Sequence, residues 1–402
     1  MNCGRLPMAI ARPLVLGVIV TFAPLVQPSP APDEGRSAQG TGGWAVHSHP
    51  CPGGNRTDAL HVDDDGTLWV GCGTNGTGYG LFVSADDGES WAAASVTPAS
   101  KFSQYRVSSI SRGHDGALYV AGTSSISGNR EMVLRVDTSI VPSPVTVVLD
   151  GVNQVGRTFH VGTYRELDDG RAIAEDLNGT NLLYRPNPSV GAGANLWTRV
   201  EGAHQILSLE ANDAGTVFFA GGSRINEPPR MFLPPDDPEA EPWEFETFAI
   251  PTATNWDGEI WGVAETDASV VAVGVDQDTA TGKIFVSGTN PYVPGDYLET
   301  DIPDYLDPGP GIGTWARGVC AHAATLVVVG ERQPLTSSSG FVLVSYDGGA
   351  SFTDITPADV SGSVSKCHLD ETRVVIVGAA GFVGIRATGD GIFRNGFEPG
   401  GN

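Results

Sequence analysis

Basic side chains stand at similar places in five segments of this chain, each near the expected start of an inner β-strand. They are Arg56, Arg106, Arg157, Arg317 and Lys366, and Trp315 lies two residues before Arg317. An arginine holds a carboxylate with two parallel N–H bonds, and a tryptophan offers a flat apolar face to a sugar. The set therefore predicts a site for an anionic ligand, such as an acidic sugar or another carboxylate. The alternative is that these residues pair with local acids, such as Asp58 and Glu259, and only solvate the surface.

The charge of the whole chain limits its partners. It carries 23 basic and 47 acidic residues, which give a formal net charge of −24. Nucleic acids and anionic membranes repel such a chain at long range, so we expect neither as a partner. The sequence contains no HExxH, GxSxG or phosphate-loop motif, and His47 and His49 lack a third and a fourth metal ligand. We therefore expect no cofactor and no metal.

A repeat of about fifty residues organises the elements that must position these side chains. Short β-branched segments that close on glycine, such as "TLWVG" at 67–71 and "TLVVVG" at 325–330, recur together with a weaker copy, "RAIAE" at 171–175. Seven units result, and each contains four short strand-like segments without a helical period. This pattern predicts an all-β fold, a seven-bladed β-propeller of four-stranded antiparallel blades over residues 43–388.

The last unit lacks its outer strand. The segment 42–49, "GGWAVHSH", precedes the first complete unit and has the character of a strand. We therefore expect this N-terminal strand to complete the last blade and close the ring. Function is then expected at the rim where the inner strands begin, because propellers bind ligands at the mouth of the central channel.

Two turns in the chain share one pattern of eight residues. "SADDGESW" at 84–91 and "SYDGGASF" at 345–352 place Ser, Asp, Gly and an aromatic residue at matching positions, namely Ser84, Asp86, Gly88 and Trp91, and Ser345, Asp347, Gly349 and Phe352. The aspartates can accept backbone N–H bonds across the turn, and the glycines can take a positive φ. The pattern resembles the Asp-box, or BNR repeat, of sialidase-like propellers. In that family the turn joins the third and fourth strands of a blade and lies opposite the substrate site, which implies a structural role.

A second segment strengthens this resemblance. "YRVSSISRGHDGALYVAG" at 105–122 is similar to the first blade of sialidases, in which the arginine that Arg106 matches holds the sialate carboxylate. Ser108 replaces the family's proline, and the family's other catalytic residues cannot be assigned, so the catalytic residues are unknown.

Three functions follow from these patterns. The leading hypothesis is a module that binds an anionic glycan or carboxylate. The alternative is an exo-glycosidase that acts on an acidic sugar, with Arg106 and Arg317 holding the carboxylate. The third is an interaction with a protein partner through loops that bear Phe232, Trp243 and Tyr305.

The two ends of the chain indicate export. Arg5 and Arg12 precede an apolar run at 13–26, as in a secretory signal peptide, which we place at 1–31 with a linker at 32–42. Residues 389–402 resemble a short C-terminal tail, of IFxxGFE type, found on exported proteins of gamma-proteobacteria. No other stretch is apolar enough to span a membrane. We expect a secreted, periplasmic or cell-surface protein that is a monomer.

Four cysteines remain after the expected cleavage: Cys51, Cys72, Cys320 and Cys367. Cys51 and Cys72 are expected near one rim of the first blade, where a disulfide would tie the closing strand to the ring. Cys320 and Cys367 take equivalent positions in neighbouring inner strands. A disulfide there requires Cα atoms closer than about 7 Å, and the alternative is two buried thiols.

Overall fold

The computed structural model describes part of the chain, and the statements below concern those residues. They are 39–40, 43–48, 50–51, 57–74, 77–102, 105–124, 131–150, 161–176, 181–185, 197–200, 205–211, 218–223, 230–233, 246–249, 258–288, 296–306, 312–333, 339–358, 360, 362–379 and 382–388. The expected signal peptide, residues 32–38 of the expected linker and the expected C-terminal tail lie outside this set. So do Arg56, Arg157 and Trp243, and the side chain of Phe232.

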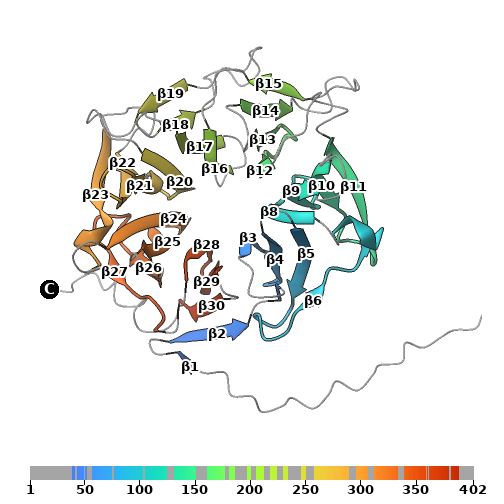
Figure 1. Ribbon diagram of the computed structural model, residues 1–402, viewed down its shortest axis with the longest axis horizontal. Coiled ribbons are helices and arrows are strands. Elements are labelled where there is room, and N and C mark those ends of the chain that lie inside the picture. Colours follow the sequence, from blue (N-terminus) through green and yellow to red (C-terminus); the bar gives the residue numbers. More distant parts are fainter. Residues whose placement is uncertain are drawn as a thin grey trace, which may run out of the picture. The chain divides into compact units, whose positions relative to one another are not determined.

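The described strands form seven sheets around a central axis, all within the compact unit Ser37–Asn402 (Figure 1). The first sheet contains β3 (Thr57–Val62), β4 (Leu68–Thr74), β5 (Thr77–Ser84) and β6 (Ala92–Ala93). The second contains β7 (Val96–Thr97), β8 (Tyr105–Arg112), β9 (Leu118–Ser124), β10 (Glu131–Val136) and β11 (Ser143–Asp150). The third contains β12 (Val161–Glu166), β13 (Ala172–Asp176), β14 (Asn181–Arg185) and β15 (Thr198–Val200).

The remaining sheets follow in chain order. The fourth contains β16 (Gln205–Ala211), β17 (Phe218–Ser223), β18 (Arg230–Leu233) and β19 (Glu246–Ala249). The fifth contains β20 (Gly258–Glu265), β21 (Val270–Asp276), β22 (Thr281–Ser287) and β23 (Tyr297–Asp301). The sixth contains β24 (Gly313–His322), β25 (Thr325–Gln333), β26 (Ser339–Ser345) and β27 (Thr353–Asp354). The last contains β28 (Val364–Leu369), β29 (Arg373–Gly378), β30 (Phe382–Ala387), β2 (Trp44–Ser48) and β1 (Gln39–Gly40).

The fold is an all-β propeller, which confirms the class that the repeat predicts, but the predicted uniform four-stranded antiparallel blades are wrong. The second and the last sheets have five strands each, and β7 pairs with β11 in parallel. The reason lies in the segment that leaves the first sheet: Val96 is buried in the core between the first two sheets, so its strand runs along the outer edge of the second. In the last sheet, β1 pairs with the outer edge of β2, within the segment expected to be a linker.

The N-terminal strand closes the ring. β2 pairs antiparallel with β30, with Trp44 opposite Arg386 and Ser48 opposite Phe382. Trp44 is buried, and its indole N–H donates to the carbonyl of Ile355 in the sixth sheet at 2.7 Å. At the other side of the junction, the Arg373 guanidinium of the last sheet pairs with Asp87 of the first. Strand pairing, packing and an ion pair therefore join the two ends of the described chain.

The apolar core lies between successive sheets. One cluster joins Ala59 and Trp69 of the first sheet to Ile110 and Val120 of the second, and equivalent clusters join later neighbours. In the last three sheets the strands β21, β25 and β29 are covered on both faces and contain runs of β-branched residues; every residue of β21 is buried. A Cβ at Gly122 or Gly330 would collide with a backbone carbonyl of the neighbouring inner strand, which explains the glycine that closes the repeated segment.

The expected pair Cys51–Cys72 and the candidate pair Cys320–Cys367 both form disulfides. Cys51 and Cys72 have Cα atoms 5.4 Å apart, and Cys320 and Cys367 have Cα atoms 5.8 Å apart. For Cys320 and Cys367 the sequence leaves open a disulfide or two buried thiols. The structure shows the disulfide, because the neighbouring inner strands approach closely enough for a bridge. It links β24 to β28, the inner strands of the last two sheets.

Loss of either disulfide should destabilise the protein measurably. Removal of a native bridge typically costs about 2–4 kcal/mol, because the unfolded chain regains conformational freedom. We expect the variants Cys51→Ala/Cys72→Ala and Cys320→Ala/Cys367→Ala each to lower the urea midpoint, and a thiol-free reductant to shift the wild-type midpoint in the same direction. Unchanged midpoints after complete reduction, verified by thiol counting, would contradict this expectation.

Candidate functional site

Every inner strand carries a β-bulge at an equivalent place. The register shifts between Thr57 and Ala59 in β3, and corresponding shifts occur in β8, β12, β16, β20, β24 and β28. The residues inside these shifts are Asp58, Ser108, Gly162 with Thr163, Leu207, Trp261, Arg317 and Ser365. A bulge bends its strand and redirects a side chain. The repeated bulge thus decides which residues line the centre of the ring.

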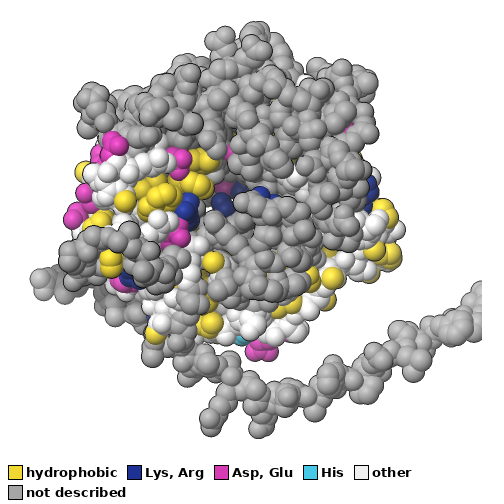
Figure 2. All heavy atoms as spheres, viewed as in Figure 1, with side chains coloured by type: hydrophobic (Ala, Val, Ile, Leu, Met, Phe, Trp, Pro, Cys, Tyr) yellow, Lys and Arg dark blue, Asp and Glu magenta, His cyan; other side chains and the backbone are white. Residues whose placement is uncertain are grey.

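A cavity of about 310 Å³ occupies the central channel at this level. All seven inner strands contribute to its wall, mostly with residues near the middle of each strand. Its charged lining consists of four basic and two acidic residues: Arg106, Arg165, Arg317, Lys366, Glu175 and Glu210. Figure 2 shows Lys and Arg side chains gathered at the hollow in the middle of the ring. The lining therefore has an excess of positive charge in a chain whose net charge is −24.

Serine hydroxyls fix the strands that carry Arg106 and Lys366. Ser108 Oγ donates to the carbonyl of Val161 in the next sheet at 2.6 Å. Ser365 Oγ, at the equivalent bulge, donates to the carbonyl of Thr57 at 2.5 Å. Each bond ties one inner strand to its neighbour, so the backbone beside the two basic residues is held rigidly. Such rigidity lowers the entropy that a ligand-binding site must lose on binding.

Arg165 is committed to an acid of the next sheet. Its Nε and Nη2 donate to the two carboxylate oxygens of Glu210 at 2.9 and 2.8 Å, and its Nη1 donates to Ser109 Oγ at 3.0 Å. Burial alone would lower the pKa of Arg165, but attraction to Glu210 raises it above its ordinary value. Arg165 therefore stays charged, and its guanidinium is already held by a bidentate pair.

Arg317 is also held by neighbours. Its Nε donates to Glu331 Oε1 at 2.9 Å, and its Nη2 contacts the same oxygen. Its guanidinium carbon lies 4.4 Å from the centre of the Trp261 ring and 4.8 Å from the centre of the Trp315 ring. The Arg317 and Glu331 side chains are only 10% and 9% exposed. A ligand carboxylate could bind the Arg317 guanidinium only if it broke the buried ion pair with Glu331.

The structure brings together three of the predicted ligand-binding residues, Arg106, Arg317 and Lys366, around one cavity. Their positions are not equivalent, however: Arg106 lies two residues before the bulge of its strand, Arg317 within the bulge, and Lys366 one residue after it. Trp315 does not line the cavity and instead contacts Arg317.

Sequence reasoning missed Arg165, Glu175 and Glu210 in the cavity wall. In the third sheet the structure describes the inner strand from Val161, and the predicted Arg157 lies outside the described residues. Alignment of the "DDG" turn at 168–170 with the "HDG" turn at 114–116 would have located the inner strand of the third sheet, because it places Val161 at the level of Val107. Alignment of the "NDAG" turn at 212–215 with "LDDG" at 167–170 would have placed Arg165 and Glu210 at one level in adjacent strands.

The two Asp-box turns have the same hydrogen bonds. Asp86 Oδ1 and Asp347 Oδ1 each accept a backbone N–H at 2.9 Å, from Ser90 and Ser351. Ser84 Oγ and Ser345 Oγ each accept the N–H of the box glycine at 2.8 Å. Gly88 and Gly349 have φ values of 79° and 95°, which glycine adopts without strain. Trp91 and Phe352 both pack against the preceding sheet.

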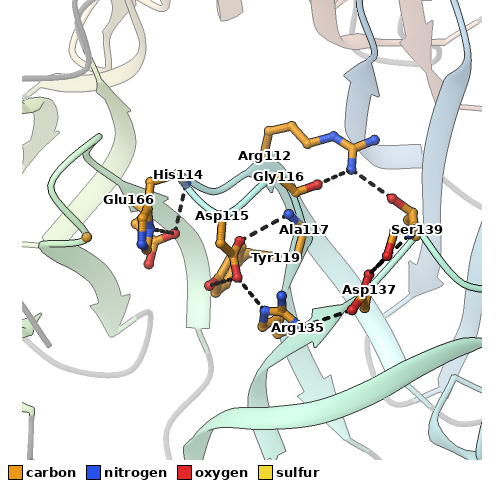
Figure 3. A network of polar contacts seen from close by, with 12 residues as sticks. Arg112, His114, Asp115, Gly116, Ala117, Tyr119, Arg135, Asp137, Ser139 and Glu166 are labelled. Carbon is orange, nitrogen blue, oxygen red and sulfur yellow. Dashed lines mark hydrogen bonds and ion pairs between the residues drawn. The ribbon is translucent and has the colours of Figure 1, made fainter. Parts of the chain in front are cut away.

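The turn between β8 and β9 carries a polar network that reaches Glu166 of the next sheet (Figure 3). Glu166 contacts the guanidinium of Arg185, and its other carboxylate oxygen lies 3.0 Å from His114 Nδ1. The phenol of Tyr164 donates to Glu166 at 3.3 Å, and burial raises the pKa of Tyr164 well above its ordinary value. Tyr164 and Glu166 are both buried and do not line the channel cavity. This Tyr–Glu pair joins the second and third sheets and is out of reach of a ligand in the channel.

No group of three or more His, Cys, Asp or Glu side chains within the described part of the chain could hold a metal ion. Nor does any helix among the described residues have the length and apolarity to cross a membrane.

Stability at acid pH should depend on Asp63, which joins the first two sheets. It accepts hydrogen bonds from Trp69 Nε1 at 2.7 Å and from Arg112 Nε at 2.9 Å. Burial alone would raise the pKa of Asp63, but its bonds from His61, Arg112 and Trp69 lower it well below its ordinary value. A carboxylate with a lowered pKa stabilises the fold above its unfolded pKa of about 3.9, and this stabilisation is lost as the pH falls below that value.

We therefore expect the urea midpoint to fall as the pH is lowered from about 5 to about 3, because the Asp63 carboxylate takes up a proton in the unfolded chain there while it stays ionised in the folded protein. Asp63→Asn should lower the midpoint at neutral pH and flatten the acid slope. Asp64→Asn, in the same turn, is the control and should leave the slope unchanged. An unaltered acid slope in Asp63→Asn would refute the role of this carboxylate.

Comparisons with known proteins show the fold. No protein-family model and no curated protein matches the sequence. Among solved structures, the chain is similar to virginiamycin B lyase from Staphylococcus aureus (TM-score 0.57, 10% identity, covering 86% of this chain and 98% of that one). It is also similar to YCF48 from Cyanidioschyzon merolae (TM-score 0.54, 16% identity, 86% and 98% covered). A third is the extracellular domain of BT4673 from B. thetaiotaomicron (TM-score 0.55, 12% identity, 84% and 39% covered).

Proposed function

We propose that this propeller is a binding module whose central channel holds the carboxylate of an acidic sugar, without chemistry on the ligand. The observation that carries the proposal is the cavity wall, where Arg106, Arg165, Arg317 and Lys366 meet inside a strongly acidic chain. We assign the ligand carboxylate to Arg106 and Lys366, because both line the cavity and Arg106 matches the arginine that holds the carboxylate in the sialidase-like group.

Electrostatics favours an anion at this place. Four basic residues against two acidic ones leave the lining with an excess of two positive charges, while the chain as a whole carries −24. A concave site with low-dielectric walls focuses such a potential and raises the local concentration of anions. The similarity to the sialidase-like group at Arg106 and at the two Asp-box turns supports an acidic sugar as the ligand, and we propose membership of that group on the same grounds.

The geometry gives less support to the exo-glycosidase alternative. A sialidase-like mechanism needs a tyrosine and a glutamate in contact with the ligand, whereas Tyr164 and Glu166 are buried and do not line the cavity. Of the carboxylates in the cavity wall, Glu210 is engaged by Arg165. General acid–base catalysis requires a group within hydrogen-bond reach of the reacting atoms.

A protein partner is a second candidate, because solved structures of similar propellers contain other molecules. YCF48 has been solved bound to D1 peptide, and an inactive virginiamycin B lyase has been solved with quinupristin. An acidic side chain or a C-terminal carboxylate of a peptide would offer Arg106 and Lys366 the same group as an acidic sugar. The experiment below separates these sources.

We further propose that the protein is exported and acts outside the cytoplasm as a monomer. The two disulfides support this, since structural disulfides persist in oxidising compartments. The similarity to an extracellular domain, that of BT4673, agrees with it.

Titration calorimetry of the protein tests the proposed function. D-glucuronate and N-acetylneuraminate should bind, more weakly as salt is added, and D-glucose should not, because it lacks the carboxylate. Fluorogenic sialosides and glucuronides should not be hydrolysed, and sustained turnover would favour the exo-glycosidase. Binding of an acidic peptide without either sugar acid would favour a protein partner, and binding of D-glucose as tight as that of D-glucuronate would contradict an anion site.

A further inference from the structure

The channel wall contains an aromatic side chain, Trp261, in addition to its basic residues. Trp261 occupies the bulge of β20 and lines the cavity. Arg317 occupies the equivalent bulge of β24, in the next sheet. Trp261, Arg317 and Trp315 form a stack in which the guanidinium contacts both indole rings. Only the first two reach the cavity, so Trp315 supports the stack from outside the channel wall.

Glycine allows the two strands to approach closely enough for this stack. A Cβ on Gly262, directly after Trp261, would lie 2.9 Å from the backbone nitrogen of Val319 and 3.0 Å from the Cα of Gly318. Any larger residue would push β20 away from β24. The backbone thus sets the distance at which the guanidinium meets the indole.

Glu331 orients the Arg317 guanidinium within the stack. It accepts hydrogen bonds from Arg317 Nε and Nη2 and from Gln333 Nε2, the last at 3.0 Å. A planar guanidinium fixed along one edge by a carboxylate presents its face to an aromatic ring, and a desolvated contact of this kind is stronger than an exposed one. Lysine has no planar group and could not fix the indole in the same way.

We infer that Arg317 is a positioning residue, which holds the Trp261 indole as a stacking platform so that the site selects carboxylates carried on a ring. The inference rests on the proposed function, since it assigns the carboxylate to Arg106 and Lys366 and adds a ring contact. It replaces the expectation that Arg317 itself holds the carboxylate. An open-chain acid of equal charge would keep the ion contacts and lose the stacking contact.

Two sugar acids separate these contributions. D-glucuronate forms a pyranose ring, whereas D-gluconate is an open chain with the same charge. By titration calorimetry the wild-type protein should bind D-glucuronate about tenfold more tightly than D-gluconate. This is the gain in affinity expected when one apolar face of a sugar ring is buried against an aromatic side chain. Trp261→Ala should bring the two affinities together by weakening D-glucuronate alone, and Trp261→Phe should keep most of the preference.

The role of Arg317 needs a variant that keeps its charge. Arg317→Lys can still pair with Glu331 but has no planar face, so it should lose the ring preference, retain binding of D-gluconate, and change the near-UV circular dichroism of the indoles. Urea midpoints establish that each variant is folded. If Arg317→Lys does not fold, the Trp261 variants alone decide the platform.

The outcomes distinguish this inference from the function on which it rests. Equal wild-type affinities for the two acids, or a preference that survives Trp261→Ala, would overturn the platform and leave the anion site intact. A preference that survives in folded Arg317→Lys would overturn the positioning role. Failure of both acids to bind the wild-type protein would overturn the proposed function, and the inference with it.

Discussion

Replacement of Trp44 by alanine is expected to destabilise the protein by about 3–5 kcal/mol, the usual cost of removing a buried tryptophan side chain. Trp44 is 1% exposed and lies in the core between the last two sheets. Its strand, β2, contributes the pairing with β30 that closes the ring. The substitution therefore opens a cavity at the one junction where strands from the two ends of the described chain pair, and it leaves the Ile355 carbonyl without its indole donor.

Urea denaturation followed by circular dichroism measures this effect. Trp44→Phe should cost less than Trp44→Ala, because it keeps most of the buried area and loses only the indole N–H bond. Leu298→Ala is the control: Leu298 is 61% exposed, so its truncation should change the free energy of unfolding by less than about 0.5 kcal/mol. A loss in Trp44→Ala no larger than that of the control would mean that β2 is dispensable for the closed ring.

Charge reversal in the channel should abolish ligand binding at concentrations where the wild-type protein is saturated. Lys366→Glu removes a charge-assisted hydrogen bond worth about 1.5–3 kcal/mol and adds repulsion, so affinity for D-glucuronate should fall by about 100-fold or more. Arg106→Glu should have a similar effect, because Arg106 lines the same cavity from another strand. The two single losses should not add, since both residues contact one ligand.

Lys101→Glu provides the matched control. Lys101 lies in the short 3-10 helix η2 (Ala99–Lys101) and does not line the cavity, yet its reversal changes the net charge by the same amount. Its affinity for D-glucuronate should stay within about twofold of the wild-type value once salt screens long-range charge. Equal losses in Lys101→Glu and Lys366→Glu would assign the effect to net charge and not to the channel.

The repeat and the closing strand could be predicted because they depend on local chemistry. A strand such as β25 is buried on both faces and needs a glycine where the backbone of the inner strand comes close, so the pattern "TLVVVG" is visible in the sequence. The strand 42–49 could be predicted from the outer strand that the last unit lacks. The prediction of four strands in every blade was wrong. The sheet to which β7 adds depends on where Val96 is buried, and no local sequence pattern encodes this.

The candidate site could be predicted only in part. Residues that seem equivalent in sequence take different levels in the channel, because Arg106 lies two residues before the bulge of its strand and Lys366 one residue after it, and the position of a bulge is not visible in the sequence. Ion pairing could not be predicted either, because the partner of Arg165 is Glu210, 45 residues further along and in another sheet. Three of the predicted cations line the cavity, but the ion pair of Arg317 with Glu331 could not be predicted from their spacing.

The central claim is that the channel cavity binds a carboxylate through Arg106 and Lys366, and a crystal structure of the protein soaked with D-glucuronate tests it most directly. The account predicts density for the sugar acid inside the ring, with its carboxylate within hydrogen-bond distance of the Arg106 guanidinium or the Lys366 ammonium. Density on the outer surface or at the opposite rim, with the channel filled only by water at saturating ligand, would contradict it.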